Sequence, residues 1–225
     1  MLSEVKETGG EGQPHEAGSA TARGLLIVVS SPSGGGKGTL IRRVLKTVPN
    51  LGYSVSFTTR RAREGETGGR DYHFISDDEF QAMIEAGEFL EWARVHAHLY
   101  GTGRSQVARE LSEGRDIILE IDVQGAQSVR GLTTDAVSVF ILPPSYEVLR
   151  DRLVGRGSED TAELALRLRN ARSEVEQYRE FDYVVINDDA DRAAAQLASI
   201  IYAERARVRR QELVAAAVLE SFPGQ

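Results

Sequence analysis

Four apolar runs rich in β-branched residues mark the buried strands of a predicted parallel sheet. They cover residues 25–29, 116–123, 137–142 and 181–187. Continuous runs of this kind are typical of strands that are covered on both faces. Helical patterns follow or separate them at 40–48, 145–154, 161–178 and 189–210, and the last can be extended through Leu219. Strands that alternate with helices predict an α/β fold, with a parallel sheet core flanked by helices.

The pattern changes in the stretch from residue 53 to residue 102. Four short strand-like segments lie there, at 53–60, 72–75, 88–95 and 98–102, with one helix at about 77–86 among them. Because helices no longer alternate with strands in this stretch, it does not continue the parallel core. We expect a small mixed β insertion that stands off the core.

Length, charge and composition limit the classes of protein to which this chain could belong. The 225 residues suit one α/β domain with insertions, and the net charge of −7 argues against a nucleic-acid binder. The absence of cysteine excludes disulfides and thiolate chemistry. No apolar stretch approaches the length of a membrane span, so we expect no membrane partner and a cytoplasmic location. Residues 1–22 are polar and small, and are expected to form a flexible tail.

The first apolar run ends in a glycine-rich loop that leads into a helix, the arrangement of a phosphate-binding loop. Three successive glycines let backbone N–H groups converge on an anion at the helix N-terminus. Lys37 adds a point charge, and the hydroxyl of Thr39 can serve a magnesium ion, directly or through its bound water. Ser31 and Gly38 depart from the usual G-x-x-x-x-G-K-[ST] pattern. A tight strand-to-helix turn is the simpler alternative reading of this loop.

Two further groups of charged residues call for an explanation. Glu120 and Asp122 lie two positions apart, so on a strand they would share one face, at its carboxyl end. The chain carries three lysines and twenty-four arginines, and several arginines crowd the predicted hairpin of 145–178. An arginine-rich, glycine-flanked hairpin fits a mobile cover for a phosphate, whereas a solvated helix pair with i,i+4 ion pairs is the simpler alternative.

Several separated motifs, in order, resemble the guanylate kinase family of nucleoside monophosphate kinases over residues 23–210. Ser33-Gly34-Gly35-Gly36-Lys37-Gly38-Thr39-Leu40 is similar to the ATP loop of that family. The segments 54–66 and 69–74 resemble its GMP phosphate grip, and 89–93 with 100–102 its guanine-binding strands. The segments 152–159 and 167–168 resemble its lid, and 184–189 its late strand. The resemblance implies a P-loop NTPase-type core, a GMP-binding insertion over about 53–103, a helical lid over about 150–172 and a C-terminal extension over 211–225.

The resemblance also implies a role for individual residues. The ATP-binding residues would be Ser31, Pro32, Ser33, Gly34, Gly35, Gly36, Lys37, Gly38, Thr39 and Asn187. The GMP-binding residues would be Ser56, Arg60, Arg63, Tyr72, Glu91, Tyr100, Thr102 and Asp122. Lys37, Arg60, Arg156 and Arg167 would act on the phosphoryl group in transit, and Thr39 would serve Mg²⁺, directly or through water. Phe57 stands where the family often has a small residue, and Arg61-Ala62 replaces a frequent Thr/Ala-Pro pair.

The implied reaction is transfer of the γ-phosphate of ATP to GMP or dGMP, with Mg²⁺ and without a covalent intermediate. A carboxylate such as that of Glu91 can accept hydrogen bonds from both the N1–H and the amino group of guanine. Adenine does not have this pair of donors. A kinase for another small phosphorylated acceptor remains an alternative, but a sugar acceptor needs no guanine reader. A second alternative is a non-catalytic guanylate-kinase-like interaction module, which the intact loop with Lys37 disfavours. A signalling GTPase is disfavoured because no Asn-Lys-x-Asp motif follows the core strands.

Overall fold

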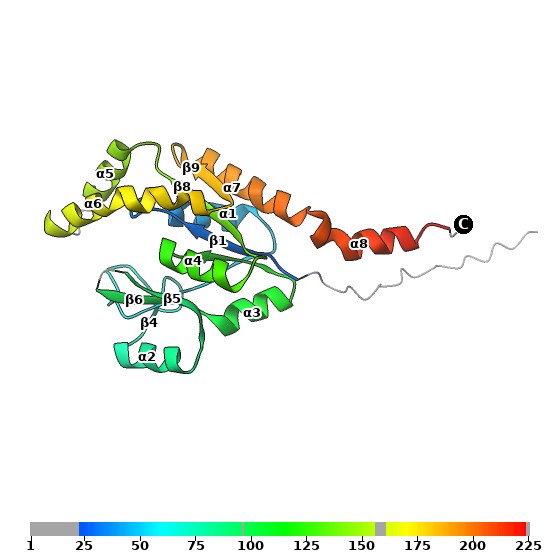
Figure 1. Ribbon diagram of the computed structural model, residues 1–225, viewed down its shortest axis with the longest axis horizontal. Coiled ribbons are helices and arrows are strands. Elements are labelled where there is room, and N and C mark those ends of the chain that lie inside the picture. The colour runs from blue at the N-terminus through cyan, green and yellow to red at the C-terminus, as the bar shows by residue number, and fades with distance from the viewer. Residues whose placement is uncertain (1–22, 96, 156–160, 224–225) are drawn as a thin grey trace, which may run out of the picture.

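The protein is described by a computed structural model over residues 23–95, 97–155 and 161–223, with side chains outside 161–167 (Figure 1). Five parallel strands form the central sheet in the order β2-β7-β1-β8-β9. The strands are β1 (Leu26–Ser30), β2 (Leu51–Tyr53), β7 (Asp116–Glu120), β8 (Val137–Leu142) and β9 (Tyr183–Ile186). Every residue of β1 is buried, as expected for a central strand covered on both faces.

Helices cover both faces of this sheet. Helix α1 (Lys37–Thr47) and α7 (Ala190–Arg205) pack against the face that carries Ile27 and Val29. On the other face, α3 (Arg104–Ser112) and α4 (Val123–Leu132) pack against Leu26 and Val28. Because strand side chains alternate between faces, the single run of β1 supplies both layers of the core. The predicted α/β core flanked by helices is confirmed.

A second sheet holds four strands in the order β4-β3-β6-β5. They are β3 (Phe57–Thr58), β4 (His73–Phe74), β5 (Phe89–Val95) and β6 (His98–Gly103). The pairing of β3 with β4 is parallel and the other two pairings are antiparallel, so the sheet is mixed, as predicted. Helix α2 (Asp77–Glu85) begins at a capping box formed by Ser76 and Glu79, and it buries Phe80 against Phe89 at 4.4 Å between ring centroids.

The predicted strand 53–60 is wrong as one element. Its first part belongs to β2, where Tyr53 pairs with Ile118 of the core sheet, and its later part is β3 of the small sheet. The backbone N–H of Ser54 still donates to the carbonyl of Ile118 at 3.0 Å, and the chain changes sheets after that bond. The core therefore has five strands rather than the four predicted.

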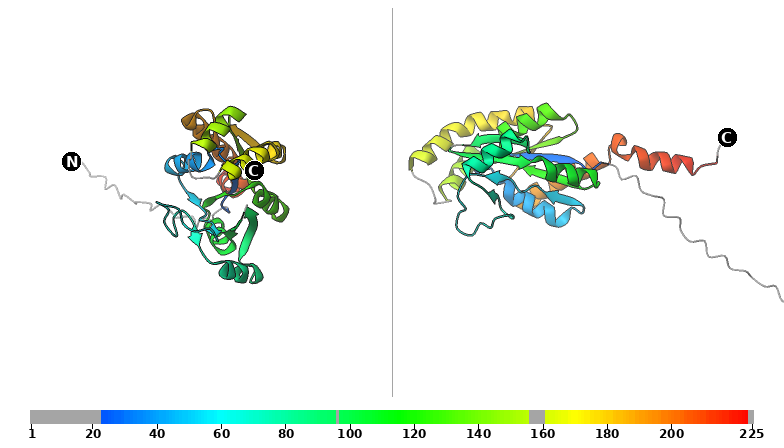
Figure 2. Two further views of the ribbon diagram at one scale, coloured as in Figure 1. Left: turned by 90° about the vertical axis from the view of Figure 1, so that its left-hand side faces the viewer. Right: turned by 90° about the horizontal axis from the view of Figure 1, so that it is seen from below.

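Three details of the helices go beyond the sequence expectation. Helix α3 follows β6 directly and was not predicted. Helix α4, which Asp122 caps, contains Gly125 in its first turn. The final helix ends at Arg205, and a separate helix α8 (Val208–Glu220) follows an extended Arg207. Figure 2 shows α8 extending away from the body, and its residues are exposed except for Arg210.

Helices α5 (Tyr146–Val154) and α6 (Thr161–Glu176), with a 3₁₀ turn η1 (Gln177–Glu180), form the predicted hairpin. Leu149 and Leu153 of α5 pack against Ala171 of α6 in a small separate core. Among the described residues, no helix is long and apolar enough to cross a membrane.

Candidate functional site

The glycine-rich loop links β1 to α1 and exposes backbone N–H groups at the start of that helix. Gly34 and Gly36 have φ angles of 83° and 88°, in the left-handed region that favours glycine. A Cβ atom on Gly36 would lie 2.4 Å from Nδ2 of Asn187, so the loop also needs glycine there for space. Gly36 caps α1 and no side chain accepts from the first turn. The arrangement leaves helix N–H groups for an anion.

The two residues that depart from the common loop pattern, Ser31 and Gly38, each lie against a specific neighbour. Ser31, buried at the first position, donates its hydroxyl to the carbonyl of Pro32 at 2.9 Å. Gly38 lies beside Glu120, whose Oε1 would be 3.2 Å from a Cβ atom at position 38. The loop therefore keeps its form without a glycine at position 31, and Gly38 leaves room for a carboxylate.

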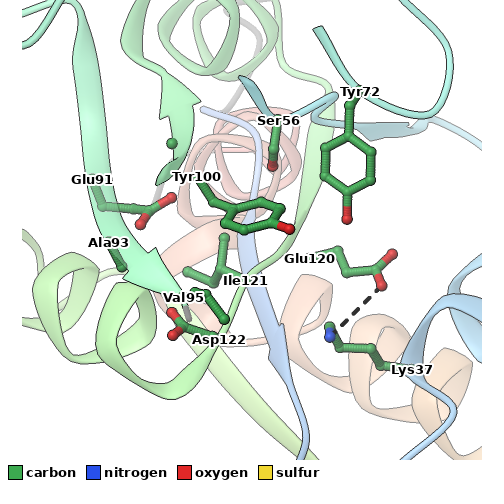
Figure 3. A pocket seen from close by; sticks show the side chains of 11 residues that line it. Lys37, Ser56, Tyr72, Glu91, Ala93, Val95, Tyr100, Glu120, Ile121 and Asp122 are labelled. Carbon is green, nitrogen blue, oxygen red and sulfur yellow. Dashed lines mark ion pairs between the residues drawn. The ribbon is translucent and has the colours of Figure 1, made fainter. Parts of the chain in front are cut away.

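Lys37 stands between the loop and a cavity of about 170 Å³ (Figure 3). Its Nζ lies 3.9 Å from Oε1 of Glu120, and both side chains are partly exposed. The hydroxyl of Tyr53 donates to Oε2 of Glu120 at 3.2 Å, and burial raises the pKa of Tyr53. Lys37 therefore lies beside a carboxylate in the lining of the cavity, and a bound phosphate could replace that carboxylate as its partner.

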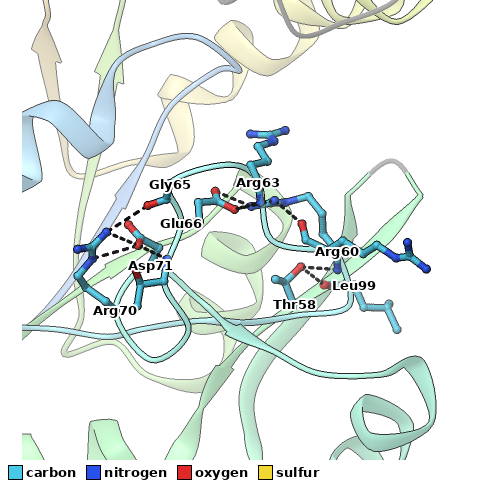
Figure 4. Close-up of polar contacts among 10 residues, drawn as sticks. Thr58, Arg60, Arg63, Gly65, Glu66, Arg70, Asp71 and Leu99 are labelled. Atoms are coloured by element: carbon cyan, nitrogen blue, oxygen red, sulfur yellow. Dashed lines mark hydrogen bonds and ion pairs between the residues drawn. The ribbon is translucent and has the colours of Figure 1, made fainter.

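The predicted phosphate grip comes from the small sheet and the loop after β3 (Figure 4). Arg60 forms two hydrogen bonds of 2.9 Å with Glu66 and a third of 2.7 Å with the carbonyl of Arg61. Its guanidinium lies 5.3 Å from the ring centroid of Tyr72, which is within cation–π range. Arg63 contacts Glu66 through its backbone N–H at 2.7 Å, while its side chain is exposed.

Two tyrosines and a serine line the same cavity. Tyr72 and Tyr100 meet edge to face at 5.9 Å between ring centroids, and Ser56 is buried beside them. Burial and the nearby Glu120 carboxylate raise the pKa of Tyr72 to about 12, so its hydroxyl stays protonated at neutral pH. Hydroxyl donors therefore face the space between Lys37 and the far end of the cavity.

That far end carries a buried carboxylate. Glu91 on β5 is 6% exposed, and the hydroxyl of the fully buried Thr102 on β6 donates to its Oε1 at 2.5 Å. Burial raises the pKa of Glu91 to about 7, the charge of Asp122 adds to the shift, and the bond from Thr102 opposes it. A half-neutralised, buried carboxylate at the end of a cavity suits a ligand that brings N–H donors.

Asp122 faces the cavity and also organises α4. Its Oδ1 accepts from the backbone N–H of Gly125 at 2.9 Å, and its Oδ2 from the side chain of Gln124 at 3.2 Å. The expectation that Glu120 and Asp122 share one strand face is only partly right. Strand β7 ends at Glu120, and Asp122 lies beyond it as a helix cap, but both carboxylates line the cavity.

The ends of β9 and α5 brace the loop from the other side. The side-chain amide of Asn187 donates to the carbonyl of Gly35 at 2.9 Å, and Asn187 is only 5% exposed. Arg152 donates to the same carbonyl at 3.4 Å and to the carbonyl of Asn187 at 2.9 Å. In this structure Asn187 therefore supports the loop that carries Lys37. Of the other predicted hairpin cations, Arg156 lies outside the described residues, and for Arg167 only the backbone in α6 is described.

Comparison with known proteins decides the family. The family model described as guanylate kinase matches residues 23–204. The chain belongs to the guanylate kinase family.

Curated guanylate kinases are similar to this chain along most of their length. The Thermotoga maritima guanylate kinase is 47% identical over 190 residues, which cover 84% of this chain and 92% of the relative. That of Symbiobacterium thermophilum is 48% identical over 200 residues, which cover 89% of this chain and 93% of the relative. The crystal structure of guanylate kinase from Anaplasma phagocytophilum superposes with a TM-score of 0.76 at 33% identity, covering 91% of this chain and 98% of that one.

In this member of the guanylate kinase family, sequence reasoning missed three residues that hold the site. Glu66 binds Arg60 and the backbone of Arg63. Its place in the same turn as both arginines is a signal that could have revealed it. Arg152 begins the segment that resembles the lid, but no contact of it with the glycine-rich loop was predicted. Glu174 accepts from the backbone N–H of Ser33 at 2.9 Å across 141 positions of sequence, and no local pattern indicates such a contact.

The residues present fit a magnesium ion that is held chiefly by nucleotide phosphates. The Glu120 carboxylate is a hard oxygen ligand near Lys37, and the Thr39 hydroxyl is exposed on the first turn of α1. Within the described residues no group of three or more acidic, histidine or cysteine side chains could bind a metal by itself. Magnesium usually keeps several waters and binds through one or two carboxylates together with substrate phosphates, so this small donor set is sufficient.

Proposed function

We propose that the protein is a guanylate kinase that transfers the γ-phosphate of ATP to GMP or dGMP, giving ADP and GDP or dGDP. The observation that carries the proposal is the single cavity of Figure 3. Lys37 from the glycine-rich loop lies at one end, and Glu91 lies at the other. Ser56, Tyr72 and Tyr100 lie along the walls between them. Such a cavity suits a nucleotide whose phosphate points to Lys37 and whose base reaches Glu91.

On the ATP side, the loop from Ser31 to Thr39 would bind the phosphates through the backbone N–H groups that follow Ser33 and through Lys37. Lys37 would leave Glu120 and bind phosphate oxygens of ATP instead. It would then stabilise the negative charge that develops as the γ-phosphoryl group is transferred. Asn187 would act mainly by keeping Gly35 in place, beside the adenosine end of ATP. Thr39 and Glu120 would hold Mg²⁺, which would neutralise the developing phosphate charge when bound.

On the GMP side, Arg60, Arg63, Ser56, Tyr72 and Tyr100 would hold the acceptor phosphate. The two hydrogen bonds that Arg60 donates to Glu66 fix the plane of its guanidinium before substrate arrives, which lowers the entropic cost of binding. An oxygen of that phosphate attacks the γ-phosphorus of ATP, and the bond to the bridging oxygen breaks so that ADP leaves. Arg156 and Arg167 would stabilise the charge in transit as members of the lid.

At the base, Glu91, Thr102 and Asp122 would recognise guanine. The ionised carboxylates accept from N1–H and the exocyclic amine, and adenine cannot supply that donor pair. A wrong base would leave buried acceptors unpaired, which costs more than the loss of one hydrogen bond. We further propose that the protein works in the cytoplasm and does not bind nucleic acid, in keeping with its net charge of −7.

A coupled assay of ADP release against a panel of nucleoside and sugar monophosphates tests the proposal. We expect turnover with GMP and dGMP and none with AMP or ribose phosphates. The Lys37→Ala variant serves as the control and should lose turnover while keeping its fold by circular dichroism. Activity restricted to AMP or a sugar phosphate would contradict the proposal, and no activity with any acceptor would favour the interaction-module alternative.

A further inference from the structure

Besides the contact of Arg152 on α5 with the carbonyl of Gly35, a carboxylate on α6 ties the backbone of the glycine-rich loop to the lid hairpin. The N–H of Ser33 donates to Oε2 of Glu174 on α6 at 2.9 Å, and both residues are partly buried. Ser33 immediately precedes Gly34, whose φ of 83° begins the left-handed part of the loop. The carboxylate therefore holds the loop at the point where its backbone turns.

Apolar packing reinforces the same junction. A Cβ atom on Gly34 would lie 3.0 Å from Cδ2 of Leu153 and 3.1 Å from Cδ1 of Leu149, so α5 presses directly on the loop. These two leucines pack against Ala171 of α6, three positions before Glu174. The loop is thus held between a hydrogen bond from α6 and an apolar contact from α5.

We propose that Glu174 is a positioning residue for phosphoryl transfer, which fixes the loop backbone at Ser33 to helix α6. This inference rests on the function proposed above. A hydrogen bond to a carboxylate is stronger than one between neutral groups, so it can hold a turn that glycine alone leaves free. Because Glu174 already satisfies the Ser33 amide, phosphate oxygens would bind the N–H groups that follow it in the loop.

The face of α6 that carries Glu174 also faces the transfer region. Asn170, Ser173 and Glu174 line a cavity of about 350 Å³ together with Ser33 and Lys37. Position 167 lies seven residues before Glu174, which is two helical turns, and so belongs to the same face. The contact at Glu174 therefore ties to the loop the helix face to which backbone position 167 belongs.

The test compares three variants of the full chain by steady-state kinetics with ATP and GMP. We expect Glu174→Ala to lower kcat by about 10-fold to 100-fold through misplacement of the loop, with KM for GMP within about twofold of wild type. Glu174→Gln should retain most of kcat, because its amide oxygen can still accept from Ser33. Glu176→Ala is the matched control: Glu176 lies on the same helix, exposed and paired with Arg172, and its loss should leave kcat unchanged.

Three results would overturn the inference. Glu174→Ala could match Glu176→Ala in kcat, in which case the contact does not position the loop. Glu174→Gln could fail to restore the rate, in which case the hydrogen bond to Ser33 is not what matters. Glu174→Ala could lower KM for ATP with no loss of kcat, in which case the carboxylate competes with phosphate. A wild-type protein that does not phosphorylate GMP would instead contradict the proposed function.

Discussion

At the residue scale, the side chain that would distinguish the proposed GMP site from a general phosphate site is Glu91. The carboxylate is buried, and the hydroxyl of Thr102 donates to its Oε1 at 2.5 Å. Burial and the nearby Asp122 raise its pKa to about 7. At about pH 7 the Glu91 carboxyl group of the free protein is therefore about half ionised. A bound base with two N–H donors would favour the ionised form.

This titration predicts a pH dependence of GMP use. A raised pKa means that Glu91 becomes protonated as the pH falls below about 7, and a protonated carboxyl group cannot accept from both donors of guanine. KM for GMP should therefore rise on going from about pH 8 to about pH 6, while KM for ATP changes little. The measurement is a pair of KM profiles across that range.

The Glu91→Gln variant provides the control for that profile. Its KM for GMP should be high throughout, and its remaining pH dependence should come from the acceptor phosphate, which titrates at about pH 6. Profiles of the same shape in wild type and Glu91→Gln would show that Glu91 does not set the pH dependence.

At the element scale, the start of α4 forms the wall behind Glu91. Asp122 caps the helix, and Gly125 lies in its first turn, close to the carboxylate. A Cβ atom on Gly125 would lie 2.5 Å from Oε2 of Glu91 and 3.1 Å from its Cδ. The helix can approach β5 this closely because position 125 has no side chain.

The Gly125→Ala variant tests this packing. The added methyl group must push Glu91 away from its place on β5, so KM for GMP should rise while KM for ATP stays within about twofold, as expected for a local displacement.

Gly131→Ala on the same helix is the matched control, because a Cβ atom there has open space around it. Gly131→Ala should raise the free energy of unfolding by about 0.5–1 kcal/mol with unchanged kinetics. Equal effects of the two substitutions on KM for GMP would contradict the packing argument.

At the scale of the whole molecule, the sequence predicts the architecture well where the signal is local. The apolar run of β1, the glycine loop and the periodicity of α1 are adjacent in sequence, so their pattern predicts that junction directly. The sequence predicts one strand over 53–60 and does not separate β2 from β3, because β2 runs on into an alternating segment and is distinguished by its pairing with β7. The break between α7 and α8 has no glycine or proline and depends on tertiary bonds such as that of Arg210 to Asp135.

The same difference between local and long-range signals applies to the site residues. Predicted residues from separate segments, among them Lys37, Glu91 and Asp122, line one cavity. The contacts that hold the loop, from Glu174 and Arg152, join positions more than one hundred residues apart. Such pairs depend on how the helices pack, and a single sequence carries no pattern for them. The exposed side chain of Arg63 likewise follows from the course of its loop rather than from residue type.

The central claim is that one cavity joins an ATP half to a separate GMP half, and the Glu91→Ala variant tests it most directly. Both substrates are varied in one set of steady-state rates, for wild type and variant. We predict that KM for GMP rises by about 100-fold or more, because the guanine donors lose a buried acceptor, while KM for ATP stays within about twofold. Equal increases in both KM values, or no change in KM for GMP, would contradict the assignment of Glu91 to the GMP half.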